Sequence, residues 1–189
     1  KSPTEITIVD KENKETNVQS DNIIISTGSE HMPLPGIEFD EEKIISSTGA
    51  LSLKSVPKKM LVVGGGYIGL EMGSVWSRLG SEVTVIEYLD FITPGMDREI
   101  SNEFQKILTK QGIKFKMGSK VESVRNKGNL VLIKYANVKN SKEETIEVDK
   151  VLVSVGRKPY TEGLNLTKIG VQKDKKGCIE VNDKLQTTI

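Results

Sequence analysis

The sequence contains few of the residues that build covalent cross-links or metal sites. It has one cysteine, Cys178, and one histidine, His31, among its 189 residues. A single cysteine cannot close an internal disulfide, and one histidine with no cysteine or carboxylate pattern around it cannot assemble a zinc site. Disulfide-scaffold and zinc-cluster proteins are therefore excluded, and Cys178 is interpreted as a structural or incidental thiol.

Long apolar runs and an excess of one charge are also missing. No apolar run approaches the roughly 20 residues that a membrane-spanning helix needs, and no secretory signal opens the chain. The 27 basic and 26 acidic side chains give a formal net charge of +1 without a long basic block. We therefore predict no nucleic-acid and no membrane partner. The protein is expected to be soluble and intracellular, with mitochondrial, plastid and cytoplasmic locations all open.

The middle of the chain alternates between strand and helix patterns. Strands are predicted at residues 60–63, 82–86 and 113–117, with one helix between each pair. The first helix should rest an apolar stripe on a sheet, and this stripe consists of Ile68, Met72, Val75, Trp76 and Leu79. The second helix carries Ile100, Phe104, Ile107 and Leu108 on one side. Such strand–helix–strand units form parallel sheets through right-handed crossovers.

The segments on either side of this middle region are predicted to form β-strands. Strands are predicted at residues 6–9 and 22–26, followed by a loop at 27–36. An antiparallel three-stranded meander is predicted from residues 120–125, 129–135 and 144–148, and a buried strand at 151–155 precedes a turn at 156–159. The fold class is therefore predicted as α/β, a Rossmann-like fold with a parallel sheet, helices and the meander; the family resemblance given below implies that it is an FAD/NAD(P)-binding fold.

A glycine motif stands where the first long helix begins. Gly64, Gly66 and Gly69 form G-x-G-x-x-G between a hydrophobic strand and an amphipathic helix, and Glu87 ends the next strand. In this context the motif is a dinucleotide-binding fingerprint. The first glycine permits a tight turn, the second lets a pyrophosphate approach the backbone, and the third allows close helix–strand packing. A ligand-free glycine turn in a flavodoxin-like domain is the less favoured interpretation.

Glu87 indicates which dinucleotide is bound. Its carboxylate can accept hydrogen bonds from both ribose hydroxyls of NAD, whereas the 2′-phosphate of NADP would meet like charge. Residues 88–91 include no arginine or lysine to accommodate that phosphate. NAD is therefore predicted over NADP. A solvated glutamate at a strand end is the alternative.

Several segments together resemble the pyridine nucleotide-disulfide oxidoreductases. They are IIISTGSE (23–30), LPGI (34–37), SSTGALSL (46–53), GGGYIGLEMGSVWSRLG (64–80), VTVIE (83–87), MDREISNEFQKILTKQGIKFK (96–116) and VGRKP (155–159). The similarity is strongest to members that serve 2-oxo acid dehydrogenase complexes. It implies a flavoprotein that passes electrons from dihydrolipoyl groups of lipoyl-bearing subunits through a cysteine pair and FAD to NAD.

The resemblance also implies site residues. The NAD-binding loop corresponds to Gly64, Gly65, Gly66, Tyr67, Ile68, Gly69, Leu70 and Glu71. By the same resemblance Glu71 lies near the nicotinamide and flavin, and Tyr67 covers the nicotinamide pocket. Val121 and Gly156 are similar to further NAD contacts. The stretch Thr27, Gly28 and Ser29 resembles one that borders FAD.

The same resemblance implies a fragment of a longer enzyme. The family's flavin glycine loop and redox cysteines would precede Lys1, and its second flavin motif and catalytic His–Glu pair would follow Ile189. Residues 1–50 are expected to be a partial FAD-domain segment and linker, 51–160 the NAD-binding domain, and 161–189 a return segment. We expect no catalytic residue and no metal site here, a homodimeric parent, and an inactive, monomeric fragment. Alternatives are another NADH-dependent flavoprotein disulfide reductase or NADH oxidase, or a non-catalytic nucleotide-binding module.

Overall fold

The computed structural model describes residue 2 and residues 4–189; Lys1 and Pro3, within the predicted N-terminal segment, lie outside the described residues. The chain forms two compact units. One comprises the described residues up to Glu30 together with Arg157–Ile189, and the other comprises His31–Gly156. The boundary predicted between residues 50 and 51 thus falls inside the second unit, to which residues 31–50 contribute a strand and a helix.

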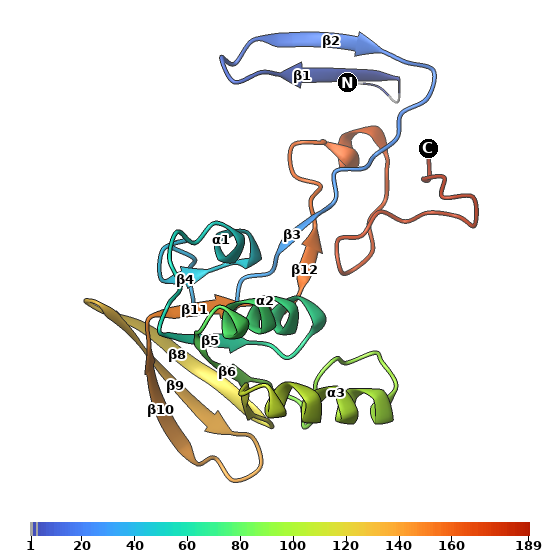
Figure 1. Ribbon diagram of the computed structural model, residues 1–189. Coiled ribbons are helices and arrows are strands. Elements are labelled where there is room, and N and C mark those ends of the chain that lie inside the picture. The colour runs from blue at the N-terminus through green and yellow to red at the C-terminus, as the bar shows by residue number, and fades with distance from the viewer. Residues whose placement is uncertain (1, 3) are drawn as a thin grey trace. The chain divides into compact units, whose positions relative to one another are not determined.

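The second unit contains a five-stranded parallel sheet of order β4-β11-β5-β6-β7 (Figure 1). Its strands are β4 (Ile44–Ile45), β11 (Lys150–Val153), β5 (Lys59–Val63), β6 (Glu82–Ile86) and β7 (Lys114–Lys116). Strands β5, β6, β7 and β11 confirm the predicted parallel sheet, with ends shifted by one or two residues. Strand β4 was not predicted, because two residues are too few to show a period.

Helix α2 (Tyr67–Arg78) connects β5 to β6, as predicted, but its buried face differs from the predicted stripe. Gly69, Leu70, Gly73 and Trp76 are buried, whereas Val75 and Leu79 are exposed. Two glycines bring this helix close to the sheet: a Cβ added at Gly73 would already touch Val62 and Val83. Because glycine contributes nothing to a hydrophobic pattern, the pattern placed the contact face at the wrong rotation.

Helix α3 (Arg98–Lys110) also begins and ends near its predicted limits. The Asp97 carboxylate accepts hydrogen bonds from the amides of Glu99 and Ile100, which caps the first turn. The predicted apolar side is only partly buried, since Leu108 is 2% exposed while Ile100 and Ile107 are about half exposed. The short helix α1 (Ser47–Leu51), capped by Ser46, was not predicted.

The predicted meander is present as a three-stranded antiparallel sheet of order β10-β9-β8. Its strands are β8 (Ser119–Lys127), β9 (Leu130–Asn137) and β10 (Glu143–Val148). Leu61 and Val63 of β5 belong to a hydrophobic cluster shared with the meander, and the alternate residues Met60 and Val62 belong to a second cluster shared with the helices. The parallel sheet is therefore covered on both faces, as its continuous apolar strands require.

The first unit holds the antiparallel hairpin of β1 (Glu5–Val9) and β2 (Glu15–Gln19) and the 3₁₀ helix η1 (Leu166–Ile169). It also holds the two-stranded pair of β3 (Ser29–His31) and β12 (Arg157–Pro159), except for His31, the first residue of the second unit. The strand predicted at residues 22–26 is wrong: this segment is irregular, and the hairpin partner is the polar β2. Its sequence ETNVQ has no apolar alternation to signal a strand. Strands β3 and β12 replace a predicted loop and a predicted turn.

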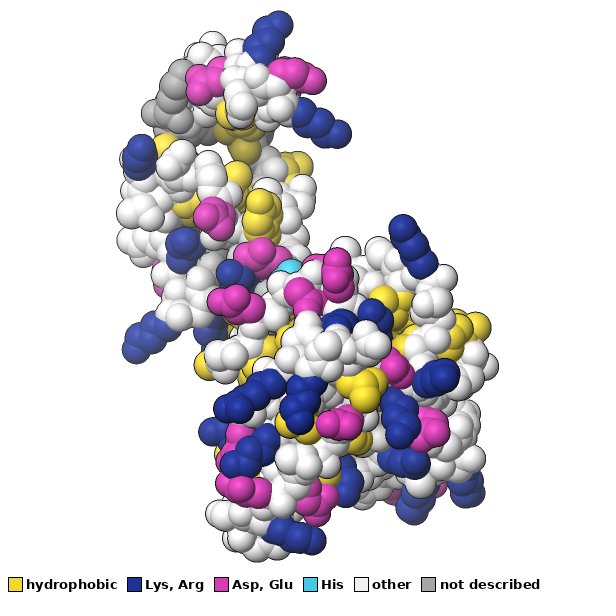
Figure 2. Space-filling model, turned by 90° about the vertical axis from the view of Figure 1, so that its left-hand side faces the viewer, with side chains coloured by type: hydrophobic (Ala, Val, Ile, Leu, Met, Phe, Trp, Pro, Cys, Tyr) yellow, Lys and Arg dark blue, Asp and Glu magenta, His cyan; other side chains and the backbone are white. Residues whose placement is uncertain are grey.

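Acidic and basic side chains are interspersed on the face seen in Figure 2, in keeping with the balanced composition. Among the helices that the described residues form, none has the length and apolar character to cross a lipid bilayer.

Candidate functional site

The glycine motif lies at the carboxyl end of β5, where the chain turns into α2. Gly64 has a φ of +105°, and its amide donates to the Ile86 carbonyl of β6 at 2.9 Å. A Cβ added at Gly64 would lie 2.6 Å from the Ser154 carbonyl oxygen. Both the backbone conformation and the space therefore demand glycine.

Gly69 is tightly packed, whereas Gly66 lies beside open space. A Cβ at Gly69 would lie 2.4 Å from Ser154 Oγ and 2.5 Å from the Gly64 carbonyl oxygen, so this glycine permits the close packing of helix on strand. A Cβ at Gly66 would have no atom within 4 Å. The protein's own packing explains the first and third glycines of the motif and leaves open space at the second.

That open space adjoins the start of α2. Gly66 is the N-cap residue and has no side chain to accept hydrogen bonds from the first amides, and no acidic residue lies in the first turn. Unpaired amides and the positive end of the helix dipole make such a helix start suitable for an anion. Tyr67 and Glu71 are exposed along this first part of the helix, Ile68 is half-buried, and Leu70 is buried.

Glu87 lies directly after β6 and is 8% exposed. Its Oε2 accepts the Gly65 amide at 2.5 Å, and its Oε1 accepts the Leu89 amide at 2.8 Å. The alternative of a solvated strand-end glutamate is therefore wrong. A carboxylate has about four acceptor positions, so two hydrogen bonds leave capacity for further donors. The acid and the glycine loop are joined directly.

Two residues that the sequence did not point to also support the loop. Ser154, after β11, donates from Oγ to the Val63 carbonyl at 3.0 Å and packs against Gly69. The Thr93 amide donates to the Gly65 carbonyl at 2.8 Å. The carboxyl ends of adjacent parallel strands meet at one sheet edge, so the neighbouring strand ends were the available signal for Ser154. Thr93 lies within the irregular segment between β6 and α3, and no sequence pattern there indicated its contact with the loop.

The remaining predicted residues lie in other surroundings. Val121 is buried, with its side chain in the cluster shared by β9 and the parallel sheet, and it lies opposite Tyr135 in the ladder of β8 and β9. Gly156, with a φ of +143°, accepts the Met32 amide at 3.0 Å.

Thr27, Gly28 and Ser29 belong to the first unit and bind the segment that begins at β12. Thr27 Oγ1 donates to the Tyr160 carbonyl, and the Tyr160 amide donates to the Gly28 carbonyl at 3.0 Å. Arg157 Nε donates to Ser29 Oγ at 2.7 Å. The structure thus brings together two of the segments that carry the family resemblance, IIISTGSE and VGRKP, although about 130 residues of chain separate them.

The chain is similar to known proteins in both sequence and structure. Dihydrolipoamide dehydrogenase of Chaetomium thermophilum is 59% identical over 93% of this chain, and the mitochondrial dihydrolipoyl dehydrogenase of Pisum sativum is 52% identical over all of it. The leghemoglobin reductase of Glycine max is 51% identical over the whole chain. The chain spans only 35% to 38% of the length of these relatives.

Solved structures show the same likeness. The HOCl-induced flavoprotein disulfide reductase RclA from Escherichia coli, in a Cu(II) complex, superposes with a TM-score of 0.86 over 99% of this chain and 41% of its own, at 29% identity. The sequence profile described as pyridine nucleotide-disulphide oxidoreductase matches residues 2–189. The chain belongs to the pyridine nucleotide-disulphide oxidoreductase family.

Proposed function

We propose that this chain is the NAD-binding portion of a flavoprotein dihydrolipoyl dehydrogenase. One observation carries the proposal: the buried carboxylate of Glu87 is bonded to the Gly65 amide, beside a helix start whose second motif glycine faces open space. These are the two contacts that an adenine dinucleotide needs, one for its diphosphate and one for its ribose.

In the proposed complex the pyrophosphate lies against Gly64–Gly69 and the amides of α2. Glu87 accepts hydrogen bonds from the ribose hydroxyls through the acceptor positions that Gly65 and Leu89 leave free. The 2′-phosphate of NADP would be repelled by the same buried carboxylate. NAD is therefore preferred over NADP. The Gly65 and Leu89 amides hold the Glu87 carboxylate in place before the dinucleotide binds.

The other predicted residues have proposed roles that follow from the family. Tyr67 covers the nicotinamide, and Glu71 lies near the nicotinamide and the flavin. Val121 and Gly156 add contacts to NAD. In the other unit Thr27–Ser29 border FAD. We accordingly assign His31–Gly156 to the NAD-binding domain and the first unit to parts of an FAD-binding domain.

The proposed parent enzyme oxidises dihydrolipoyl groups on lipoyl-bearing subunits of 2-oxo acid dehydrogenase complexes. Electrons pass through a cysteine pair to FAD, and the flavin delivers a hydride to NAD. This chain contributes no redox pair, since Cys178 is its one cysteine and lies exposed. Its contribution is to hold the dinucleotide and orient the nicotinamide.

A second candidate is another flavoprotein disulfide reductase of the same family. The close superposition with the Escherichia coli disulfide reductase RclA favours it. The identities of 52% and 59% to dihydrolipoyl dehydrogenases, against 29% to RclA, favour the first candidate.

Calorimetric titration with NADH and NADPH tests the proposal. We expect the unmodified chain to bind NADH more tightly than NADPH and to show no turnover of lipoamide. Glu87→Ala should reduce this preference by about one to two powers of ten, because charge-assisted hydrogen bonds of roughly 1.5–3 kcal/mol are lost. Glu87→Gln, which preserves the volume of the side chain, should also reduce it.

Glu82→Ala is a matched control, because this exposed glutamate begins the same strand and pairs only at the surface with Lys114. It should leave the preference unchanged. Absence of NADH binding, tighter binding of NADPH, or an unaltered preference in both Glu87 variants would refute the proposed function.

A further inference from the structure

We propose that Glu144, on the meander, is a positioning residue for Glu87 and thereby sets the preference for NADH over NADPH. It acts through Lys116 at the end of β7. The inference rests on the proposed function, and it assigns a specificity role to residues that do not touch the glycine loop.

The tip of β6 is fastened to the end of β7 by main-chain hydrogen bonds. The Glu87 amide donates to the Lys116 carbonyl at 3.0 Å, and the Glu87 carbonyl accepts the Ser119 amide at 2.9 Å. The Leu89 carbonyl accepts the Gly118 amide at 2.8 Å. The position of the Glu87 backbone therefore depends on the position of residues 116–119.

Strand β7 gives that segment little support of its own. It has three residues and lies at the edge of the parallel sheet, with β6 as its one neighbour in the sheet order. Such a short edge strand has few ladder hydrogen bonds to hold its end in place. Gly118 and Ser119 are held by pairing with the meander, at the Val138 amide and at Asn137. Lys116, whose carbonyl receives the Glu87 amide, is therefore the residue of this segment that depends on a further anchor.

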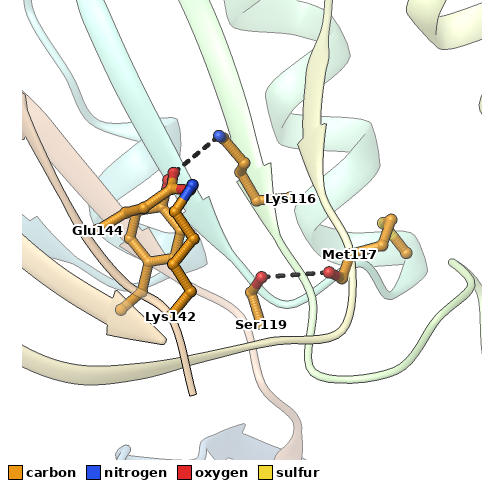
Figure 3. A network of polar contacts seen from close by, with 6 residues as sticks. Lys116, Met117, Ser119, Lys142 and Glu144 are labelled. Atoms are coloured by element: carbon orange, nitrogen blue, oxygen red, sulfur yellow. Dashed lines mark hydrogen bonds and ion pairs between the residues drawn. The ribbon is translucent and has the colours of Figure 1, made fainter. Parts of the chain in front are cut away.

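The anchor comes from the meander (Figure 3). Lys116 Nζ lies 3.0 Å from Glu144 Oε2. The Tyr135 hydroxyl donates to the same oxygen at 2.7 Å. Lys142 Nζ lies 3.5 Å from the other oxygen, Oε1. Tyr135 is 4% exposed, so its ring is fixed in the core and its hydroxyl fixes the carboxylate that receives Lys116. The hydrogen bond from Tyr135, followed by that from Lys116, lowers the pKa of Glu144 to about 2, which keeps the carboxylate charged.

The connection from meander to site is continuous. Tyr135 of β9 holds Glu144 of β10, Glu144 holds the Lys116 side chain, and the Lys116 carbonyl holds the Glu87 amide. Without the Glu144 anchor, the end of β7 can move and the Glu87 carboxylate loses its fixed distance to the ribose. The ribose of NADH then loses hydrogen bonds to the Glu87 carboxylate, which weakens NADH binding. The 2′-phosphate of NADPH is repelled less by the same carboxylate, so the preference for NADH falls.

Lys116→Met tests this directly, because it removes the ammonium group and keeps an apolar stem of similar length. In calorimetric titrations of the full chain, we expect the ratio of NADH to NADPH affinities to fall by about threefold to tenfold, which corresponds to roughly 0.7–1.4 kcal/mol. Lys116→Arg, which can still pair with Glu144, should restore most of the ratio. Lys134→Met is the matched control, since Lys134 pairs with Glu122 and Glu143 on the same meander.

The ratio distinguishes positioning from general loss of stability, because a partly unfolded variant binds both nucleotides less and leaves their ratio unchanged. An unaltered ratio in Lys116→Met, or an equal fall in Lys134→Met, would overturn this inference and leave the proposed function standing. A failure of the unmodified chain to bind NADH would overturn the proposed function, and this inference with it.

Discussion

The three glycines of the motif differ in whether the packing of the protein requires a glycine at their position. Gly64 and Gly69 are required by the protein itself, because added Cβ atoms would strike the Ser154 main chain and side chain. Gly66 has a φ of −75° and open space around it, so the folded protein would accept a side chain there. Packing therefore does not explain the second glycine, whereas the proposed function does, because it places a diphosphate there.

This difference predicts opposite results for two alanine variants. Gly69→Ala should lower the free energy of unfolding by about 1–3 kcal/mol, as expected for overpacking. Gly66→Ala should lower it by no more than about 1 kcal/mol, the cost of alanine at an N-cap, and yet weaken NADH binding, because its Cβ occupies the space where the proposed diphosphate approaches. Urea unfolding and NADH titration of each variant would check both expectations. Normal NADH affinity in Gly66→Ala would contradict the ligand explanation.

Single residues of the candidate site could be predicted from the sequence where the position requires a particular residue type. The glycine spacing and Glu87 could be predicted because few other residues satisfy a turn or a buried acceptor at those positions. Ser154 and Thr93 could not, because serine and threonine occur widely and their contacts with the loop depend on which strands become neighbours.

Among the elements, the long periodic ones were predictable and the short or polar ones were not. The patterns located α2, α3 and the meander but missed β2, β4 and α1, which are brief or lack apolar alternation. The patterns also misplaced the contact face of α2, since the sheet packs against glycines there. Hydrophobic spacing reports apolar side chains, whereas close backbone approach is a property of the assembled sheet.

The link between β7 and β10 should make stability depend on pH. The pKa of Glu144 is lowered from its ordinary 4.5 to about 2, chiefly by the Tyr135 hydroxyl. A lowered pKa means that the contribution to stability is fully present above pH 4.5 and is lost as pH falls towards 2. Glu144→Gln should therefore be less stable than the unmodified chain near neutral pH, with a difference that shrinks between pH 4.5 and 2.

Urea unfolding across that pH range measures the difference. Glu147→Gln offers a comparison, because Glu147 lies on the same strand and its pair with Lys127 spans 4.0 Å. Its effect should be smaller at every pH. A difference for Glu144→Gln that persists unchanged at pH 2 would contradict the assigned ion pair.

For the whole molecule, the two hydrophobic clusters fix where an independent unit ends. All members of both clusters come from His31–Gly156, including Ile37, Ile44 and Ile45, which precede the domain start predicted at residue 51. The family resemblance could suggest a nucleotide domain, but its N-terminal limit depends on which later strand pairs with β4. That pairing joins residues about 100 positions apart and leaves no local signal.

A polypeptide of residues 31–156 should consequently fold alone and, under the proposed function, bind NADH with the same affinity as the full chain. A polypeptide of residues 51–160, the domain predicted from sequence, should be much less stable because it lacks β4, with the buried Ile44 and Ile45, and the buried Ile37 before it. Thermal unfolding followed by circular dichroism, together with NADH titration, compares the two. Equal stability of both polypeptides would show that β4 contributes little.

Helix α2 starts at Gly66, which has no side chain to cap the first amides. In the proposed complex a bound diphosphate caps these amides and becomes part of the native architecture. If the proposed function is correct, the free energy of unfolding rises with the concentration of NAD by RT ln(1 + [L]/Kd). In a cell with little NAD, more of this protein would then be unliganded, and proteases would degrade it sooner than in a cell with ample NAD.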